Sequence, residues 1–435
     1  MLRRPSFFLV ILLTVSFSKQ ILAQDLVAIY QQVELSDPRL LIGHQNYQIG
    51  EARQRQALGE LLPQANFSSS LTSTEREVDD LDSFEQFGGE RYAISVRQPL
   101  FNMERFRSWQ RAKSVTEQFG YKRDDTVAKV RLDTIERYFQ YLKAKDELNL
   151  ITEDKADTKL RLEQTQALFD KNLVRITELL EVQSSLDLLE AQEISAEQTL
   201  EMARESLIEI TGQPVSYVAQ LREETNFARP EMSVDELLDR AMLHNPALNA
   251  LGSEIDAAKK NIQSKRAQHL PTVNLELSKQ ETDIGFDNTQ TPKSDSEVIS
   301  LSINVPIYSG GVTSARVEES ARQLVVSQAT LDQTRREIIK ELKDMFFGMR
   351  STLRQIEATD KAITSASKSL EAMNRGFELG MSTISDVLDA QKELLSAKRS
   401  HQQARYDYVI TRARLAFLSG GMDEQVMAEI NSWLD

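Results

Sequence analysis

The fold is decided by a stretch without proline, IIKELKDMFFGMRSTLRQIEATDKAITSASKSLEAMNRGF, at residues 338–377. Apolar side chains recur along it at spacings of three, four or seven residues, and these are Ile338, Leu342, Met345, Met349, Leu353, Ile356, Ile363, Ala366, Leu370, Met373 and Phe377. Such a stripe is typical of a helix that packs against partner helices in the manner of a coiled coil. We interpret it as a packing seam.

The stretch belongs to a longer segment without proline, 312–378, and a second such segment covers residues 103–170. Both are rich in Ala, Leu, Glu, Lys, Arg and Gln, which are strong helix formers. At 1.5 Å per residue, each predicts a helix of about 100 Å, several times the length of an average globular helix. The whole chain of 435 residues has only 16 Gly and 10 Pro, and this scarcity of turn residues also indicates a protein made mostly of long helices.

The two long segments belong to an internal duplication. Pairs of similar residues lie 208 positions apart, namely Asp37-Pro38 with Asn245-Pro246, Leu62-Pro63 with Leu270-Pro271, Tyr138-Phe139 with Phe346-Phe347, Phe169 with Phe377, and Thr211-Gly212 with Ser419-Gly420. Gln98-Pro99-Leu100-Phe101 matches Val305-Pro306-Ile307-Tyr308 with a slip of one residue. We therefore predict two structural repeats, 24–232 and 233–435, the first of which ends in a linker that contains Pro230.

Each long helix is predicted to end at a turn, after which the chain runs back antiparallel. Asn172 and Gly380 occupy matching places in these turns, and both residue types adopt the left-handed conformation that ends helices. Return helices are expected at 176–211 and 383–418, opened by Thr177-Glu178 and Ser385-Asp386. Each would stack end to end on the helix that precedes the strands, 37–62 in the first repeat, so that every repeat supplies one continuous and one composite rod.

Two segments, 64–100 and 271–308, alternate between apolar and polar residues and predict strand hairpins. The polar stretches inside them, Glu75–Glu90 and Lys279–Glu297, are expected to be long acidic loops. The pattern is typical of outer-membrane barrel strands, although a half-buried hairpin of a soluble protein would give the same alternation in any single strand. Because four strands cannot close a barrel and two copies would give one filled by side chains, a conduit would need at least three copies.

The N-terminus predicts export. Arg3 and Arg4 precede an apolar run from Phe7 to Phe17, which indicates a signal peptide over residues 1–23. The alternative is a membrane anchor, but the apolar run would span only about half of a bilayer core. The net charge of −14 argues against a nucleic-acid partner. With no Cys in the chain, disulfides, thiolate metal sites and Cys nucleophiles are excluded.

Signals of enzymatic activity are missing, so we expect no catalytic, metal or cofactor site. The four histidines are scattered without metal-ligand spacing, at His44, His244, His269 and His401, and no phosphate-binding loop follows a strand. Gly310-Gly311 is interpreted as a strand-to-helix turn rather than a phosphate loop. Energy for any transport would therefore come from a partner.

The ordered set of features resembles the TolC family of outer-membrane efflux and secretion channels. The strings that carry the resemblance include Asp37-Pro38, Leu270-Pro271-Thr272, Val305-Pro306-Ile307-Tyr308-Ser309-Gly310-Gly311 and Ile384-Ser385-Asp386-Val387-Leu388-Asp389-Ala390. The resemblance implies a mostly α, α+β chain with four strands. Three copies would share one 12-stranded outer-membrane barrel and continue as a periplasmic coiled-coil helical barrel. It also implies docking to a periplasmic adaptor and to an inner-membrane RND or ABC transporter.

By the same resemblance the two helical turns are the periplasmic tips, which would dock the adaptor through Asn172, Leu173, Val174, Gly380, Met381 and Ser382. Asp386 and Asp389, with Glu178 of the first tip, are candidates for acids at a closed entrance. Asp386 could equally serve only the helix N-terminus, and Asp389 could lie on a solvated face.

The chain departs from the family at the entrance. An Arg and a Tyr that usually help to hold it shut are replaced by Ser382 and Phe377, so Arg175 is the candidate replacement cation, pairing with Asp386 or another tip acid. The competing function is a periplasmic coiled coil without a pore, of structural or adhesive role, which would leave the strands unexplained.

Overall fold

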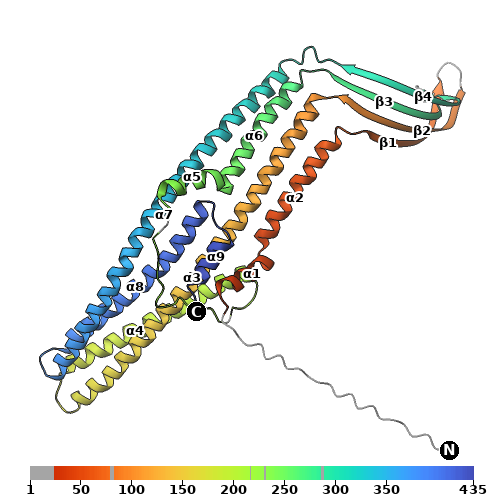
Figure 1. The fold of residues 1–435 in the computed structure, drawn as a ribbon. Helices are drawn as coiled ribbons and strands as arrows, with labels where there is room; N and C mark the ends of the chain where they lie inside the picture. Colours follow the sequence, from red (N-terminus) through yellow and green to blue (C-terminus); the bar gives the residue numbers. More distant parts are fainter. Residues whose placement is uncertain (1–23, 79–82, 216, 230–231, 286–288) are drawn as a thin grey trace, which may run out of the picture.

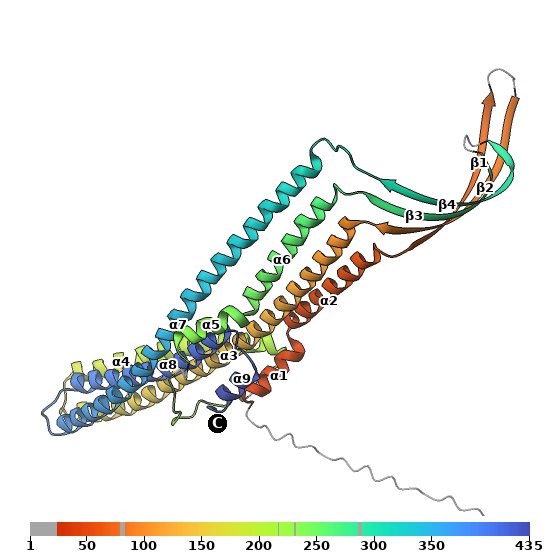
Figure 2. The ribbon, with the colours of Figure 1, turned by 45° about the horizontal axis from the view of Figure 1, so that its top comes forward.

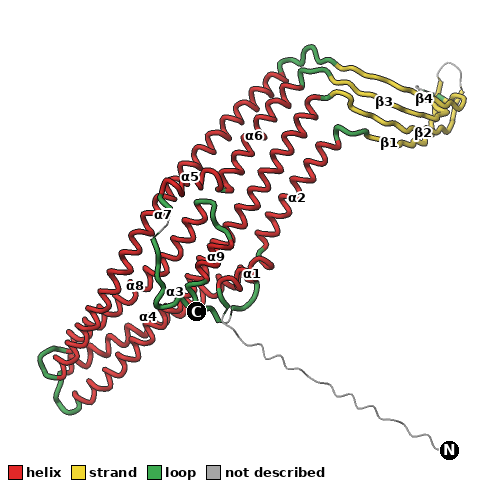
Figure 3. The backbone as a smooth tube through the Cα atoms, viewed as in Figure 1, coloured by secondary structure: helices red, strands yellow, loops and turns green. Residues whose placement is uncertain are grey.

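The computed structural model describes residues 24–78, 83–215, 217–229, 232–285 and 289–435. The expected signal peptide, 1–23, lies outside the described residues. The molecule is elongated, with the helices along most of its length and the strands gathered at one end (Figures 1 and 3). The turns between the long helices and their return helices lie at the other end, far from the sheet in both views of the ribbon (Figures 1 and 2).

Nine helices are present in the described part of the chain: α1 (Leu26–Ser36), α2 (Pro38–Gly59), α3 (Met103–Phe169), α4 (Ile176–Thr211), α5 (Val234–His244), α6 (Pro246–Ala267), α7 (Val312–Glu378), α8 (Ile384–Leu418) and α9 (Glu424–Asn431). The two longest, α3 and α7, have 67 residues each, or about 100 Å at 1.5 Å per residue. Helices α2 and α4 follow one another along α3, and α6 and α8 do the same along α7 (Figure 1). The mostly helical class and the internal duplication are confirmed.

The Asp-Pro and Asn-Pro pairs lie between two helices of each repeat, where the sequence predicted one helix. Asp37 and Asn245 are the N-cap residues of α2 and α6, and each side chain accepts a hydrogen bond from the backbone N–H two residues ahead. The proline follows at the first helical position, where a backbone N–H would have no partner within the helix, so the N–H that proline lacks costs no hydrogen bond. The prediction of a helix over 37–62 was therefore too long, since α2 ends at Gly59, and it missed α1, α5 and α9.

Four strands form one antiparallel sheet in the order β1 (Gln64–Val78), β2 (Ser83–Phe101), β3 (Thr272–Ile284) and β4 (Gln290–Asn304). Strands β2 and β3 join the two repeats, with Val96 opposite Leu277. The predicted long loops were wrong, because the strands continue through most of both segments. Polar side chains stabilise these extensions across strands, as where Lys279 Nζ lies 2.9 Å from Glu297 Oε1 and 3.3 Å from Asp295 Oδ2.

The apolar core lies around the middle of the long axis, where the short helices meet α3 and α8 (Figure 1). Leu26, Ile29, Tyr138, Phe139 and Ile430 are fully buried there. The Tyr138 hydroxyl donates a hydrogen bond of 2.8 Å to the Ala219 carbonyl oxygen, so the segment after α4 is fixed to α3. The core thus holds the two composite rods where their halves meet.

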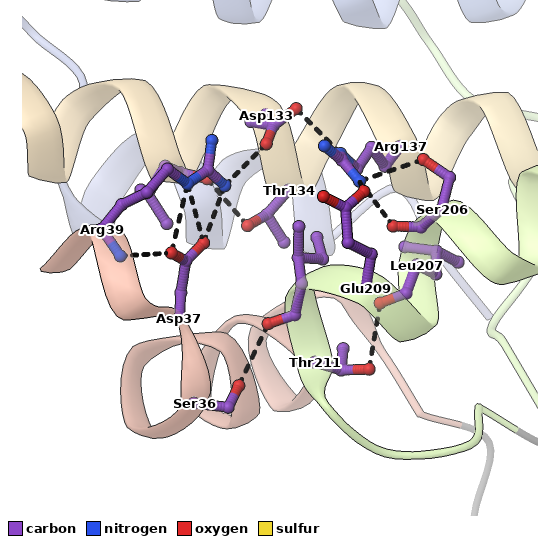
Figure 4. Close-up of polar contacts among 12 residues, drawn as sticks. Ser36, Asp37, Arg39, Asp133, Thr134, Arg137, Ser206, Leu207, Glu209 and Thr211 are labelled. Atoms are coloured by element: carbon purple, nitrogen blue, oxygen red, sulfur yellow. Dashed lines mark hydrogen bonds and ion pairs between the residues drawn. The ribbon is translucent and has the colours of Figure 1, made fainter.

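A charged network joins α1, α2, α3 and α4 beside this core (Figure 4). Arg39 Nη2 lies 2.7 Å from both Asp37 Oδ2 and Asp133 Oδ2, and Arg137 Nε lies 3.0 Å from Asp133 Oδ1. Burial acts to raise the pKa of Asp37, but the hydrogen bonds from Arg39 outweigh it and leave that pKa below its usual value. The equivalent positions of the second repeat are Asn245, Ala247, Glu341 and Met345. Only the first repeat therefore has an ionic junction here.

Candidate functional site

Both helical turns have the same backbone structure. Asn172 has a φ of 59° and Gly380 a φ of 75°, the left-handed conformation predicted for them. The N–H of Leu173 donates to the Leu168 carbonyl oxygen at 2.9 Å, and the N–H of Met381 donates to that of Gly376 at 2.7 Å. The repeat is thus reproduced in the hydrogen bonds that end the long helices.

The six residues proposed for adaptor docking, Asn172, Leu173, Val174, Gly380, Met381 and Ser382, lie at these turns. Leu173 and Met381 are 68% and 75% exposed. Exposed apolar side chains at a loop tip indicate a contact surface when they gather in one place. Ser382 differs from the others because it packs back on the end of α7, where a Cβ on Gly376 would lie 2.3 Å from Ser382 Oγ. This close approach explains why residue 376 is a glycine, a position that the sequence did not single out.

The return helices begin differently from the prediction. Thr383 is the N-cap of α8, and Asp386 completes a capping box by accepting hydrogen bonds from the Thr383 N–H at 2.8 Å and the Thr383 hydroxyl at 2.7 Å. Arg175 is the N-cap of α4, and its side chain makes no capping hydrogen bond. Thr177 and Ser385 were wrongly expected to open these helices, because a reciprocal cap needs the acid three residues after the hydroxyl, not one.

The candidate gate acids have separate partners, and of the three Asp386 and Asp389 are exposed whereas Glu178 is half-buried. Hydrogen bonds from the backbone and then the hydroxyl of Thr383 lower the pKa of Asp386, so it is a carboxylate at neutral pH. Asp389 lies 4.0 Å from Lys392 Nζ. Arg175 Nε donates to Glu178 Oε1 at 3.0 Å, so Arg175 pairs with a tip acid, as expected, and that acid is Glu178.

An apolar cluster, which we call the tip cluster, joins all four helices near the turns. It consists of Val182 on α4, Ile384 and Leu388 on α8, Leu162 on α3 and Phe377 on α7. Val182 and Ile384 are completely buried. Phe377 therefore contributes packing where a Tyr could contribute a hydrogen bond. Within one protomer, the two helical hairpins are held together at the tips by this apolar contact, which sequence reasoning missed.

Polar contacts continue the connection between the hairpins above the tip cluster. Gln391 Nε2 on α8 donates to Asp154 Oδ1 at 2.6 Å and to Thr158 Oγ1 at 3.1 Å, both on α3. Arg161 Nη1 donates to Asn374 Oδ1 on α7 at 3.1 Å. Burial raises the pKa of Asp154, and the hydrogen bond from Gln391 acts against it. Separating the hairpins would break these hydrogen bonds.

The sheet carries an apolar band that crosses its strands obliquely. One row across the sheet consists of Ala65, Val96, Leu277 and Ile299. In β1 the band continues from this row away from the helices, through Phe67 and Leu71. In β4 it continues toward the helices, through Leu301 and Ile303. Strands of membrane barrels tilt by about 35–45°, so a band level with the membrane crosses them obliquely. Apart from the half-buried Val96 these side chains are exposed, with Phe67 at 70% and Ile299 at 77%.

None of the helices that the structure describes has the length and apolarity to cross a membrane. Among the described residues, no group of three or more His, Asp or Glu side chains is arranged to hold a metal ion.

Comparison with known proteins identifies the family. The sequence matches the family described as outer membrane efflux protein over residues 29–213 and 237–421, one match in each repeat. The chain is 29% identical to outer membrane protein TolC of Vibrio cholerae, over 96% of each chain. It is 28% identical to the alkaline protease secretion protein AprF of Pseudomonas aeruginosa, over 89% of this chain and 83% of that protein.

Solved structures show the same fold. CusC superposes with a TM-score of 0.82 at 15% identity, over 92% of this chain and 93% of that one. The open state of the MtrE outer membrane channel of Neisseria gonorrhoeae gives a TM-score of 0.77 at 15% identity, over 93% and 91%. The family match and the relatives TolC and AprF support an exit duct and not the alternative, a periplasmic coiled coil without a pore. The chain belongs to the outer membrane efflux protein family and is a TolC-like exit duct of the outer membrane for efflux or secretion.

Proposed function

We propose that three copies of the chain assemble into one channel with a 12-stranded barrel. The observation that supports this most is the oblique apolar band on a four-stranded sheet whose outer strands, β1 and β4, have no further partner strand in the described chain. An unpaired strand edge cannot lie in hydrocarbon, because its N–H and C=O groups would lack hydrogen bonds. Pairing β4 of one copy with β1 of the next removes every edge.

The number of copies follows from the width of the barrel. Two copies would give eight strands, whose interior side chains fill, and three give the smallest barrel with an open passage. The helices of each copy would continue that passage through the periplasm. Helices α3 and α7 are each long enough, at 67 residues, to carry it about 100 Å from the sheet.

The tips are the proposed contact with a periplasmic adaptor. The two turns lie at the end farthest from the sheet (Figure 1). Leu173, Leu379 and Met381 are their exposed apolar side chains. The adaptor would link the channel to an inner-membrane transporter of the RND or ABC class, which supplies the energy. Asp386, Asp389, Glu178 and Arg175 lie beside the tips and are the proposed gate.

Protein secretion through an ABC transporter is the favoured route. Two relatives named as secretion proteins, AprF of Pseudomonas aeruginosa and PrtF of Dickeya chrysanthemi, match this chain over 89% and 85% of its length, whereas the solvent efflux pump protein SrpC of Pseudomonas putida matches 41%. Deleting the gene, with a plasmid copy as the control, would separate the routes. Loss of a secreted protein with unchanged drug tolerance supports the ABC route, and the reverse supports an RND partner.

Conductance of the purified protein tests the channel itself. Outer-membrane fractions would be extracted in mild detergent, the mass of the complex measured, and the complex inserted in a planar bilayer. A trimer that conducts supports the proposal. A monomer, or a trimer without conductance under any condition that opens the tips, contradicts it.

A further inference from the structure

The polar face of the sheet carries few charges, and they do not cancel. Strand alternation places Arg91, Arg97 and Glu276 on the face opposite the apolar band. The part of the sheet between the row of Arg91 and the helices consists of residues 64–70, 91–101, 272–282 and 294–304. Within these described residues, the three are the only ionisable side chains on that face. Arg97 Nη2 lies 3.3 Å from Glu276 Oε2, so these two charges compensate one another and Arg91 is left over.

Arg91 has neutral neighbours in its row across the strands. Its row across the sheet consists of Ser70, Thr282 and Ser294, which are all hydroxyl residues. The Nε–H of Arg91 is buried and has no hydrogen-bond partner, and Arg91 forms no ion pair within the described part of the chain. Glu90 and Glu281, which adjoin this row along the strands, belong to the other face, since successive side chains alternate. Asp283 also adjoins the row, at a register shift in β3, but its Oδ1 accepts a hydrogen bond of 2.6 Å from the Glu90 N–H and it forms no ion pair with Arg91.

We propose that Arg91 is a selectivity-determining residue of the barrel lumen, where it attracts anions and the anionic groups of exported substrates. The inference rests on the proposed trimeric channel, in which the polar face lines the lumen and three Arg91 side chains share one level. The chain as a whole has a net charge of −14, and its tips carry the acids named above. The passage would therefore be acidic at its periplasmic entrance and basic in the barrel.

The three Arg91 side chains of the proposed trimer would attract anions through their electric field and not by direct coordination. A 12-stranded barrel keeps three side chains too far apart to hold one small ion between them. Fixed charge on the wall still raises the local concentration of counter-ions within a Debye length, which is about 30 Å at 0.01 M salt and about 3 Å at 1 M. The effect is thus a change in ion selectivity at low salt that disappears at high salt.

The test is the reversal potential of single channels in a tenfold KCl gradient at about 10 mM and 100 mM, where screening is weak. Arg91→Gln should shift the potential toward cation selectivity, and Arg91→Glu should shift it further in the same direction. Arg91→Lys keeps the charge and should match the wild type. The control is Lys279→Gln, which removes a cation from the opposite face of the sheet and should leave the potential unchanged.

The outcomes separate this inference from the proposed channel. A wild-type protein that forms no conducting trimer overturns both. Conducting Arg91→Gln and Arg91→Glu trimers with the wild-type reversal potential overturn the role of Arg91 and leave the channel intact. A shift of equal size in Lys279→Gln would show that surface charge, not lumenal charge, sets selectivity, and would also overturn the inference.

Discussion

Arg175 pairs with Glu178, one turn ahead on its own helix, through a hydrogen bond of 3.0 Å from Nε to Oε1, and it does not reach Asp386. Asp386 is engaged in the capping box with Thr383. No ion pair links the first tip to the second among the described residues of one protomer. The link is instead the tip cluster, in which Val182 of α4 packs with Ile384 and Leu388 of α8.

Leu388→Ala should therefore open the entrance more than Arg175→Ala. The Arg175 side chain is 74% exposed, and an exposed ion pair contributes about 0–1 kcal/mol. Truncating a buried leucine such as Leu388 costs about 2–5 kcal/mol. Resting single-channel conductance should rise clearly in Leu388→Ala, slightly in Arg175→Ala and not at all in Leu379→Ala, which removes an exposed leucine from the same tip. A large increase confined to Arg175→Ala would assign closure to the ion pair.

Divalent cations added from the periplasmic side should block the current. In the proposed trimer, six carboxylates, from Asp386 and Asp389 of each copy, would lie near a narrow mouth, where such a ring would attract cations. The double variant Asp386→Asn, Asp389→Asn should weaken the block, measured as the cation concentration that halves the current. Asp332→Asn, in α7 and remote from the turns, is the control. If block is the same in the double variant, these acids do not line the entrance.

Gly380→Val should abolish export while the trimer still forms. The left-handed conformation of Gly380 is costly for a β-branched residue, although no atom lies within 4 Å of a Cβ added there. The matched control is Gly380→Asn, because Asn172 has the same conformation at the equivalent position. Export and cross-linking to the adaptor should survive in Gly380→Asn. Full export by Gly380→Val would place the docking surface elsewhere.

Acidification should destabilise the helical region through His401. Its Nδ1 lies 3.1 Å from Thr359 Oγ1 on α7, and burial, followed by the neighbouring Arg405, lowers its pKa despite the opposing charge of Asp360. As the pH falls, His401 therefore becomes protonated in the unfolded chain first, at about pH 6.5 and below. The free energy of unfolding then decreases with each further fall in pH until His401 is protonated in the folded protein too.

The thermal midpoint, followed by circular dichroism between about pH 7 and pH 5, should fall less in His401→Gln than in the wild type. His44→Gln, at an exposed position of α2, should behave as the wild type does. Equal slopes in all three proteins would remove His401 from the pH response.

The long helices could be predicted because proline and period are local signals. The left-handed turns were predictable for the same reason, since Asn172 and Gly380 carry their preference in the residue itself. The strand extensions could not be predicted. Beyond Leu277 the side chains on the face of the apolar band change from apolar to charged, so the alternation of apolar and polar residues disappears. Their stability comes from cross-strand partners such as Lys279 and Glu297.

The tip cluster could not be predicted from the sequence either. Val182 and Leu388 are in different repeats and meet only after both hairpins have formed and packed together. The ionic junction of Asp37, Arg39 and Asp133 is of the same kind, because its partners lie on separate helices. Sequence reasoning therefore found the turns and the candidate acids, and it missed the contacts that hold them in place.

The amount of trimer in outer-membrane fractions of Leu301→Lys and Ser300→Lys cells is the most direct test of the membrane-spanning sheet. These neighbours lie on opposite faces of β4, and Leu301 is 59% exposed within the apolar band. A lysine that faces lipid near the bilayer midplane costs about 2–4 kcal/mol in each protomer, whereas one that faces the lumen remains in water. We expect Leu301→Lys to deplete the trimer and Ser300→Lys to assemble as the wild type does. Equal assembly of the two variants, or depletion of Ser300→Lys alone, would contradict the assignment of the sheet faces and the barrel that depends on it.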